Sequence, residues 1–170
     1  MSRYVVFSHG QESGPWGAKI SALAGIARAE GYEVESVDYR GLDDAQERVT
    51  RLLAYCREFQ GRLVLVGSSM GGHVSTAGSR LLRAAGLFLL APAFYMPGFE
   101  ELTPQPAACP ITIVHGWRDD VVPVEHSIRY AREHGATLHI LDTDHRMQDQ
   151  VRQIGYYFEY FLVSLDKFGT

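Results

Sequence analysis

The sequence contains few cysteines and no long apolar segment. Only two of its 170 residues are cysteines; Cys56 lies within a helical pattern and Cys109 precedes a proline. This spacing does not resemble a disulfide framework, so we expect both to be free thiols. No apolar run approaches the roughly 20 residues that a transmembrane helix needs. With 46% hydrophobic and 21% charged residues, the composition is typical of a soluble globular protein.

Basic clusters are also missing, and we expect no leader segment. The formal net charge is −4, and no run of Lys and Arg marks a surface for nucleic acid or an anionic membrane. The first residues, MSRYVVFSHG, enter a strand-like run at the fourth position, which leaves no room for the regions of a signal peptide. We therefore expect a cytoplasmic protein whose partner is a small molecule, and neither nucleic acid nor a membrane. No pattern indicates an oligomeric state.

Strand-like and helix-like segments alternate along the chain. The predicted strands cover residues 4–8, 34–39, 62–67, 86–91, 111–116 and 137–141, and the predicted helices cover 16–30, 44–60, 70–84, 124–134 and 147–165. This alternation, with strands that are apolar almost throughout, predicts an α/β fold with a parallel sheet between helices on both faces. At this length, and without a repeat, we expect one domain over residues 1–170.

Residues 92–110 break this alternation. They hold five of the seven prolines and are predicted to form a loop that is too short for a lid domain. Phe94, Tyr95 and Met96 follow the carboxyl end of a predicted strand, which is the edge where open α/β sheets bind ligands. With Trp16 they are candidates for the lining of a substrate pocket, and packing beneath the loop or at its rim would explain them equally well.

The most informative stretch is GSSMG at residues 67–71. It fits the pattern G-x-S-x-G and lies between a predicted strand and a predicted helix, where a sharp turn holds its central serine, Ser69, exposed. Small residues flank that serine because the turn brings those positions into close contact. A glycine-rich turn without chemistry is the alternative. A nucleotide-binding loop does not fit, because His73 follows Gly72 where a P-loop needs lysine, and SHGQESG after the first strand is not G-x-G-x-x-G.

A serine nucleophile needs a base, and the base needs a carboxylate that orients it. Two segments at the carboxyl ends of predicted strands can supply both: HGWRDDVVP at 115–123 and DTDHRM at 142–147. They lie on the sheet edge that carries Ser69, and the chain order serine, aspartate, histidine is the expected one. The amide of Met70, at the start of a predicted helix, is placed to bind an oxyanion. These features predict an acyl-transfer site.

A metal site is a rival interpretation of the same segments. His115, Asp119, Asp120 and His145 carry suitable ligand atoms, but no paired-ligand spacing such as H-E-x-x-H occurs. We therefore expect neither a metal nor a cofactor. His115, like His9, precedes a glycine at a strand end, and we expect both to shape those turns.

Together, HGQ after the first strand, GSSMGG at the turn, HGWRDDVVP and DTDHRM resemble the α/β-hydrolase superfamily, in particular its small, lidless bacterial esterase-like members. The match covers almost the whole chain. The site residues that the resemblance implies are the nucleophile Ser69, the acid Asp119, the base His145 and, for the oxyanion hole, the amide of Gln11 beside that of Met70. The first antiparallel strands of larger members are missing and the cap is reduced to 92–110, so the substrate does not carry over.

The resemblance and the right-handed crossovers of parallel sheets predict an α/β-hydrolase fold with strand order 2-1-3-4-5-6. The expected activity is hydrolysis of a small carboxylic ester or thioester through an acyl-enzyme at Ser69. A non-catalytic binding or regulatory module with the same fold is the alternative from another class. An acyl transferase or a C–C hydrolase could use the same residues.

Overall fold

Six parallel strands form one sheet in the computed structural model, which describes residues 1–168. The strands are β1 (Arg3–Ser8), β2 (Glu33–Val37), β3 (Arg62–Ser68), β4 (Gly86–Leu90), β5 (Ile111–Gly116) and β6 (Thr137–Leu141). Their order is β2-β1-β3-β4-β5-β6, and each neighbouring pair is parallel. This confirms the predicted fold class and strand order. Residues 169 and 170 lie outside the described residues, and a single domain over 1–170 stays a prediction.

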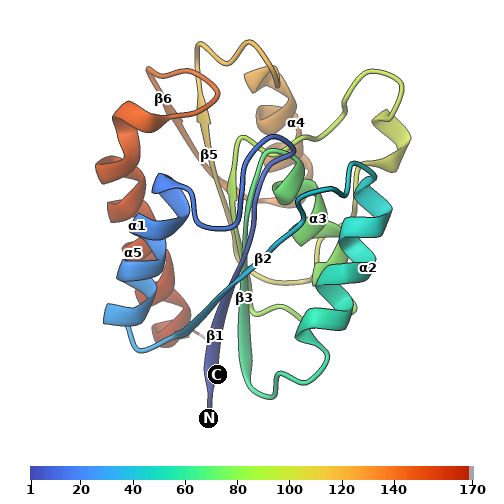
Figure 1. The fold of residues 1–170 in the computed structure, drawn as a ribbon. Coiled ribbons are helices and arrows are strands. Elements are labelled where there is room, and N and C mark those ends of the chain that lie inside the picture. Colours follow the sequence, from blue (N-terminus) through green and yellow to red (C-terminus); the bar gives the residue numbers. More distant parts are fainter. Residues whose placement is uncertain (169–170) are drawn as a thin grey trace.

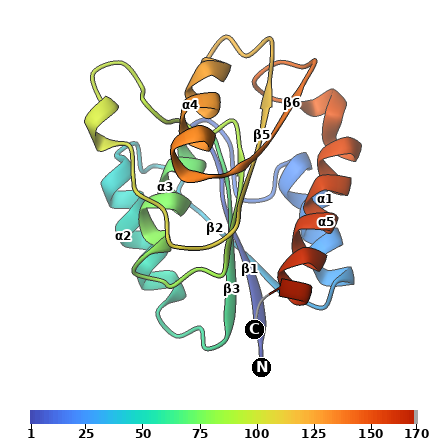
Figure 2. The ribbon, with the colours of Figure 1, turned by 180° about the vertical axis from the view of Figure 1, so that it is seen from behind.

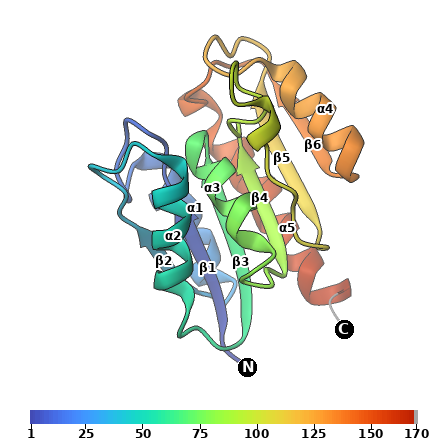
Figure 3. The same cartoon turned by 90° about the vertical axis from the view of Figure 1, so that its right-hand side faces the viewer.

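Helices cover both faces of the sheet. Within the described residues they are α1 (Ala18–Ala29), α2 (Ala45–Cys56), α3 (Met70–Ser79), α4 (Val124–His134) and α5 (Val151–Phe168). Figure 1 shows α1 and α5 on one face of the sheet and α2, α3 and α4 on the other, and Figure 3 shows this second group in front of the strands. None of the helices in residues 1–168 is long and apolar enough to span a bilayer.

Alternate side chains of the central strands enter two separate cores. Along β1, Val5 and Phe7 pack with residues of α1 and α5, whereas Val6 between them packs with residues of α2 on the opposite face. All five residues of β4, GLFLL, are buried. Because helices cover both faces, neither face of a central strand needs polar side chains, which explains the continuous apolar runs.

Several predicted boundaries shift for local reasons. The third helix ends at Ser79 rather than at residue 84, and Arg83 beyond it has a φ of 52°. The last helix begins at Val151 rather than at 147, because Met147 has a φ of 51°, a left-handed conformation that cannot continue into an α-helix. The proline-rich loop contains a short 3-10 helix, Glu100–Leu102.

The carboxyl ends of the parallel strands share one edge of the sheet. That edge is at the top of Figure 1, opposite the N-terminus, and Figure 2 shows the same arrangement from behind. The loops that leave β1, β3, β5 and β6 therefore all begin at this edge. They carry the residues that the sequence analysis selected.

Candidate active site

Ser69 lies on a sharp turn between β3 and α3. Its backbone has a φ of 54° and a ψ of −117°, a conformation that residues other than glycine rarely adopt. Hydrogen bonds hold this residue on both sides. Its N–H donates to the carbonyl of Leu90 at 2.9 Å, and its carbonyl accepts from the N–H of Ala93 at 3.0 Å. The strained turn is therefore fixed by its contacts with the end of β4 and the loop that follows.

Two glycines make this turn possible. A Cβ atom on Gly71 would overlap with the carbonyl group of Ser8 at the end of β1, and a Cβ atom on Gly67 would overlap with the carbonyl group of Gly71. The start of α3 thus packs directly against the backbone of β1. This close approach is the physical reason for the small residues in the G-x-S-x-G pattern.

The side chains of Ser69, His145 and Asp119 form one hydrogen-bonded chain. His145 Nε2 lies 3.1 Å from Ser69 Oγ, and His145 Nδ1 lies 2.7 Å from Asp119 Oδ2. An ionised carboxylate only accepts hydrogen bonds, so Nδ1 carries the proton of a neutral His145 and Nε2 is left to accept from the serine hydroxyl. His145 is partly exposed at the cavity, whereas the side chain of Asp119 has no exposure to solvent. The arrangement can remove a proton from Ser69.

Four hydrogen bonds converge on the carboxylate of Asp119. Oδ1 accepts from the amides of Val121 and Val122, each at 2.8 Å. Oδ2 accepts from His145 and, at 2.9 Å, from Nε2 of His115. Burial opposes ionisation of this group, but the hydrogen bonds outweigh burial and hold the pKa of Asp119 below its ordinary value. Asp119 is therefore ionised at neutral pH.

His115, which the sequence analysis placed only in a turn, belongs to this cluster. It is fully buried, its Nδ1 lies 2.7 Å from Ser127 Oγ, and its Nε2 lies 2.9 Å from the carbonyl of Val122 as well as from Asp119. Both partners of Nε2 are acceptors, so Nε2 carries the proton and Nδ1 accepts from Ser127.

Among residues 1–168, no three His, Cys, Asp or Glu side chains are arranged to hold a metal ion.

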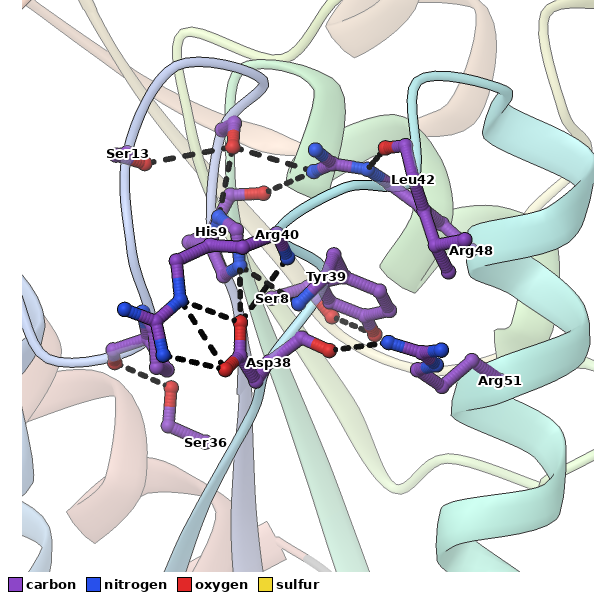
Figure 4. Close-up of polar contacts among 12 residues, drawn as sticks. Ser8, His9, Ser13, Ser36, Asp38, Tyr39, Arg40, Leu42, Arg48 and Arg51 are labelled. Carbon is purple, nitrogen blue, oxygen red and sulfur yellow. Dashed lines mark hydrogen bonds and ion pairs between the residues drawn. The ribbon is translucent and has the colours of Figure 1, made fainter.

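A buried arginine supports the loop after β1. Arg48 of α2 is 1% exposed; its Nε donates to the carbonyl of Leu42 at 2.7 Å, and its Nη1 donates to the carbonyls of His9 and Gly10 at 3.0 and 3.2 Å (Figure 4). Its Nη2 lies 3.5 Å from the carbonyl of Gln11. The sequence analysis missed this residue. The signal that could have found it is its place on the buried face of α2, which is otherwise apolar.

His9 fixes the same loop through its two ring nitrogens. Nε2 accepts from the backbone N–H of Tyr39 at 2.9 Å, and Nδ1 donates to the carbonyl of Gly10 at 2.7 Å. Figure 4 also shows the hydroxyl of Tyr39 bonded to that of Ser8, at 2.8 Å. Burial lowers the pKa of His9 and so favours the neutral ring that this pattern requires.

A cavity of about 580 Å³ opens beside Ser69. The loop after β1, the start of α1 and the segment after β6 line it, and Gln11 and His145 are among the lining residues. Met70 directly follows Ser69 as the first residue of α3, a position whose N–H has no acceptor within its own helix. The volume is in the range of small-molecule sites.

Three charged side chains line the same cavity: Glu12, Lys19 and Arg146. Glu12 and Arg146 are exposed, whereas Lys19, in the first turn of α1, is half-buried. Burial lowers the pKa of Lys19 to about 8, although the nearby carboxylates of Asp144 and Asp119 act in the opposite direction. No sequence motif pointed to Lys19.

The sequence analysis predicts that three aromatic residues and one methionine line a substrate pocket. Within residues 1–168, the residues around the cavity do not include Trp16, Phe94, Tyr95 or Met96. Phe94 is fully buried and stacks on Tyr130 of α4, with ring centroids 4.0 Å apart, and Tyr95 beside it is 8% exposed. Trp16 is 47% exposed and Met96 is half-buried. The substrate-pocket role of these four residues stays a prediction, and the structure shows that the loop packs Phe94 and Tyr95 near Tyr130 of α4.

Comparisons with known proteins agree with this architecture. A sequence model described as the alpha/beta hydrolase family matches residues 5–162. The structure of a candidate hydrolase of the alpha/beta superfamily from Xanthomonas campestris pv. campestris has a TM-score of 0.89 and 32% identity, covering 95% of this chain and 99% of that chain. A comparison with curated proteins finds no significant match.

Two solved structures with lower identity share the fold. Est1E from Butyrivibrio proteoclasticus has a TM-score of 0.86 at 16% identity, covers 98% of this chain and 89% of that chain, and has also been solved with ferulic acid bound. An alpha-beta serine hydrolase homologue from Coxiella burnetii has a TM-score of 0.80 at 21% identity, covering 95% of this chain and 86% of that chain. At these identities the likeness concerns the fold alone.

Proposed function

We propose that this chain, which belongs to the alpha/beta hydrolase family, is a serine hydrolase that cleaves a small carboxylic ester or thioester through an acyl-enzyme at Ser69. The observation that carries the proposal is the chain of two hydrogen bonds from Ser69 Oγ to His145 Nε2, at 3.1 Å, and from His145 Nδ1 to Asp119, at 2.7 Å. It joins a nucleophile to a base and the base to a carboxylate that orients it.

In the acylation half-reaction, Ser69 Oγ attacks the carbonyl carbon of the substrate while its proton moves to His145 Nε2. The tetrahedral intermediate collapses when the bond from carbon to the leaving oxygen or sulfur breaks, and His145 gives its proton to that atom. The imidazolium that exists between these two steps is stabilised by Asp119, whose depressed pKa keeps it charged beside the ring.

In the deacylation half-reaction, water replaces the alcohol or thiol. His145 Nε2 accepts a proton from the water as its oxygen attacks the acyl carbon, and the bond from that carbon to Ser69 Oγ then breaks. The proton returns from His145 to Ser69 Oγ, which restores the resting enzyme. The products are a carboxylic acid and the alcohol or thiol, so the net reaction is hydrolysis.

Backbone amides bind the oxyanion in this proposal. The N–H of Met70 adjoins Ser69 at the start of α3, and Gln11 lies on the loop that Arg48 supports. A developing negative charge on the carbonyl oxygen is stabilised most strongly when such donors are already in place before the reaction. The hydrogen bonds that Arg48 and His9 make within and to this loop therefore support the oxyanion role of Gln11.

Substitution of each of the two adjacent serines tests the proposal. Ser69→Ala should reduce the hydrolysis of p-nitrophenyl esters or acyl thioesters about a thousandfold or more, whereas Ser68→Ala should keep much of the activity. A fluorophosphonate probe should label the wild-type protein and Ser68→Ala, but not Ser69→Ala.

The outcomes separate the alternatives. Absence of both turnover and labelling in the wild-type protein would favour a non-catalytic binding module. Labelling without release of free acid, but with acyl transfer to an added alcohol, would instead indicate a transferase. Reversed effects of the two serine substitutions would show that Ser68 is the nucleophile.

A further inference from the structure

Two cationic side chains beside the proposed nucleophile lack protein partners. Lys19 and Arg146 both line the cavity that contains Ser69 and His145. Within residues 1–168, neither side chain takes part in a hydrogen bond or an ion pair. Lys19 interacts at longer range with the charges of Asp144, Asp119 and Arg146.

Several other half-buried or exposed cations form ion pairs within the protein. Arg3 and Arg62 both pair with Asp166, and Arg129 pairs with Glu133 at 2.9 Å. Lys19 is more enclosed than a surface cation and still unpaired, which is unfavourable because a desolvated charge without a partner loses its interaction with water. An unpaired cation that lines a cavity is a ready partner for an anionic ligand.

We propose that Lys19 and Arg146 bind a carboxylate carried by the substrate, so that the preferred substrate is a monoanionic ester or thioester. The inference rests on the function proposed for Ser69 and names the substrate class of that site. Binding of an anion would supply the partner that Lys19 lacks in the free protein.

The remaining charges around the cavity favour one carboxylate over a polyanion. Glu12, the acidic residue of the lining, is exposed and forms no ion pair with Lys19 within the described part of the chain, so the lining keeps one net positive charge. Asp119 is enclosed by its four hydrogen-bond donors, and Asp144 Oδ1 accepts from the backbone amides of Arg146 and Met147. A ligand with several negative charges would meet repulsion from Glu12.

The carboxylate could lie on the acyl part or on the alcohol part of the ester, and two substrate pairs distinguish these cases. The first pair is mono-p-nitrophenyl adipate and its methyl ester, which differ by one charge on the acyl part. The second pair is para-acetoxybenzoate and its methyl ester, which differ by one charge on the alcohol part. The quantity to measure is the ratio of kcat/KM for the anionic over the neutral member, corrected for spontaneous hydrolysis.

We expect the wild-type protein to prefer the anionic member of at least one pair by about tenfold, the effect of one charge-assisted contact. In Lys19→Met, this ratio should fall about tenfold. In Arg146→Gln it should fall by a smaller factor, because Arg146 is more exposed to water and salt. The matched control is Lys167→Met, which removes the only other lysine of the sequence, an exposed residue near the end of α5. The control should keep the wild-type ratio.

A wild-type ratio near one for both pairs would overturn the proposal, as would a ratio that Lys19→Met leaves unchanged. If the wild-type protein cleaves no ester, the proposed hydrolase function fails by itself, and binding then tests the inference separately. Calorimetry should show tighter binding of monomethyl adipate than of dimethyl adipate, with the difference lost in Lys19→Met. Equal affinities would contradict the anion site whatever the catalytic activity.

Discussion

The two sides of Ser69 use charge in different ways. On the side of β5 and β6, the carboxylate of Asp119 accepts four hydrogen bonds, two from backbone amides and two from the rings of His115 and His145. On the side of β1 and α1, Arg48 donates only to backbone carbonyls, and Lys19 has no partner in residues 1–168.

Buried or half-buried charges therefore occur here in three different environments. A carboxylate that is fully satisfied orients a base, and it does so through a fixed network that leaves little freedom. A guanidinium that donates only to carbonyls holds the backbone in place, because it supplies hydrogen bonds to several carbonyl groups at once. A cation left without a partner is available to a ligand.

The largest expected effect on catalysis comes from disrupting the hydrogen bonds between Asp119 and the two histidine rings. Asp119→Asn replaces an acceptor by an amide that cannot accept from both histidine rings, so the wrong tautomer of His145 is favoured. We expect kcat to fall about 10²–10⁴-fold. The matched control is Asp120→Asn at the adjacent, exposed position, where the loss should be small. Steady-state kinetics under identical conditions check this, and a larger loss for Asp120→Asn would reject the assignment of the acid.

Removing the hydrogen bonds of Arg48 to the loop after β1 should reduce catalysis less than Asp119→Asn does, but it should clearly lower the stability of the fold. Arg48→Met removes a donor from the carbonyls of Leu42, His9 and Gly10, of which Gly10 keeps the hydrogen bond from His9 Nδ1, and we expect the free energy of unfolding to drop by roughly 2–4 kcal/mol. If the loop positions an oxyanion donor at Gln11, kcat should fall about tenfold or more with little change in KM.

The control for this prediction lies on the same helix. Arg51 is exposed and donates to the carbonyl of Asp38 at 2.8 Å (Figure 4), so Arg51→Met removes an arginine from α2 without touching the loop after β1. Denaturant unfolding and kinetics should both be close to wild type. A destabilised Arg48→Met with wild-type kcat would show that Arg48 supports the fold and not the proposed oxyanion hole.

The smallest expected effect is a pH dependence of the preference for anionic over neutral esters. Asp119 has a lowered pKa and stays ionised throughout the neutral range, so the β5 side should not titrate through this residue. Lys19 is protonated below its pKa of about 8 and loses its charge above it. The ratio of kcat/KM for anionic over neutral esters should therefore be highest below pH about 8 and decline a few-fold above it. In Lys19→Met the ratio should show no such step.

The sheet could be predicted from the sequence because its signal is local and repeated. The central strands are apolar runs and most crossovers contain a helix, and right-handed crossovers together with the family resemblance give the strand order that the structure confirms. The same topology brings Ser69, Asp119 and His145 to one edge. Their catalytic roles stay a proposal, but their proximity follows from where each lies relative to the end of a strand.

The structural features that the sequence did not predict depend on contacts between segments that are far apart in the chain. In the sequence, Arg48 looks like an ordinary polar residue of an amphipathic helix. Only the structure shows that it is buried and donates to the loop after β1. Phe94 and Tyr95 follow a strand on the ligand-binding edge, yet the loop packs them near Tyr130 of α4, a contact that no local pattern encodes. Lys19 carries no motif, and only the burial around it distinguishes it from a surface lysine.

The loop after β1 and the turn at Ser69 differ in how closely they are packed. Gln11, Glu12 and Ser13 line the cavity from an exposed loop, outside both buried cores. Gly71, in contrast, is held against the end of β1 with no space for a side chain. Substitutions of these exposed side chains are therefore expected to change the lining of the cavity at little cost in stability, whereas any side chain at position 71 would displace the end of β1.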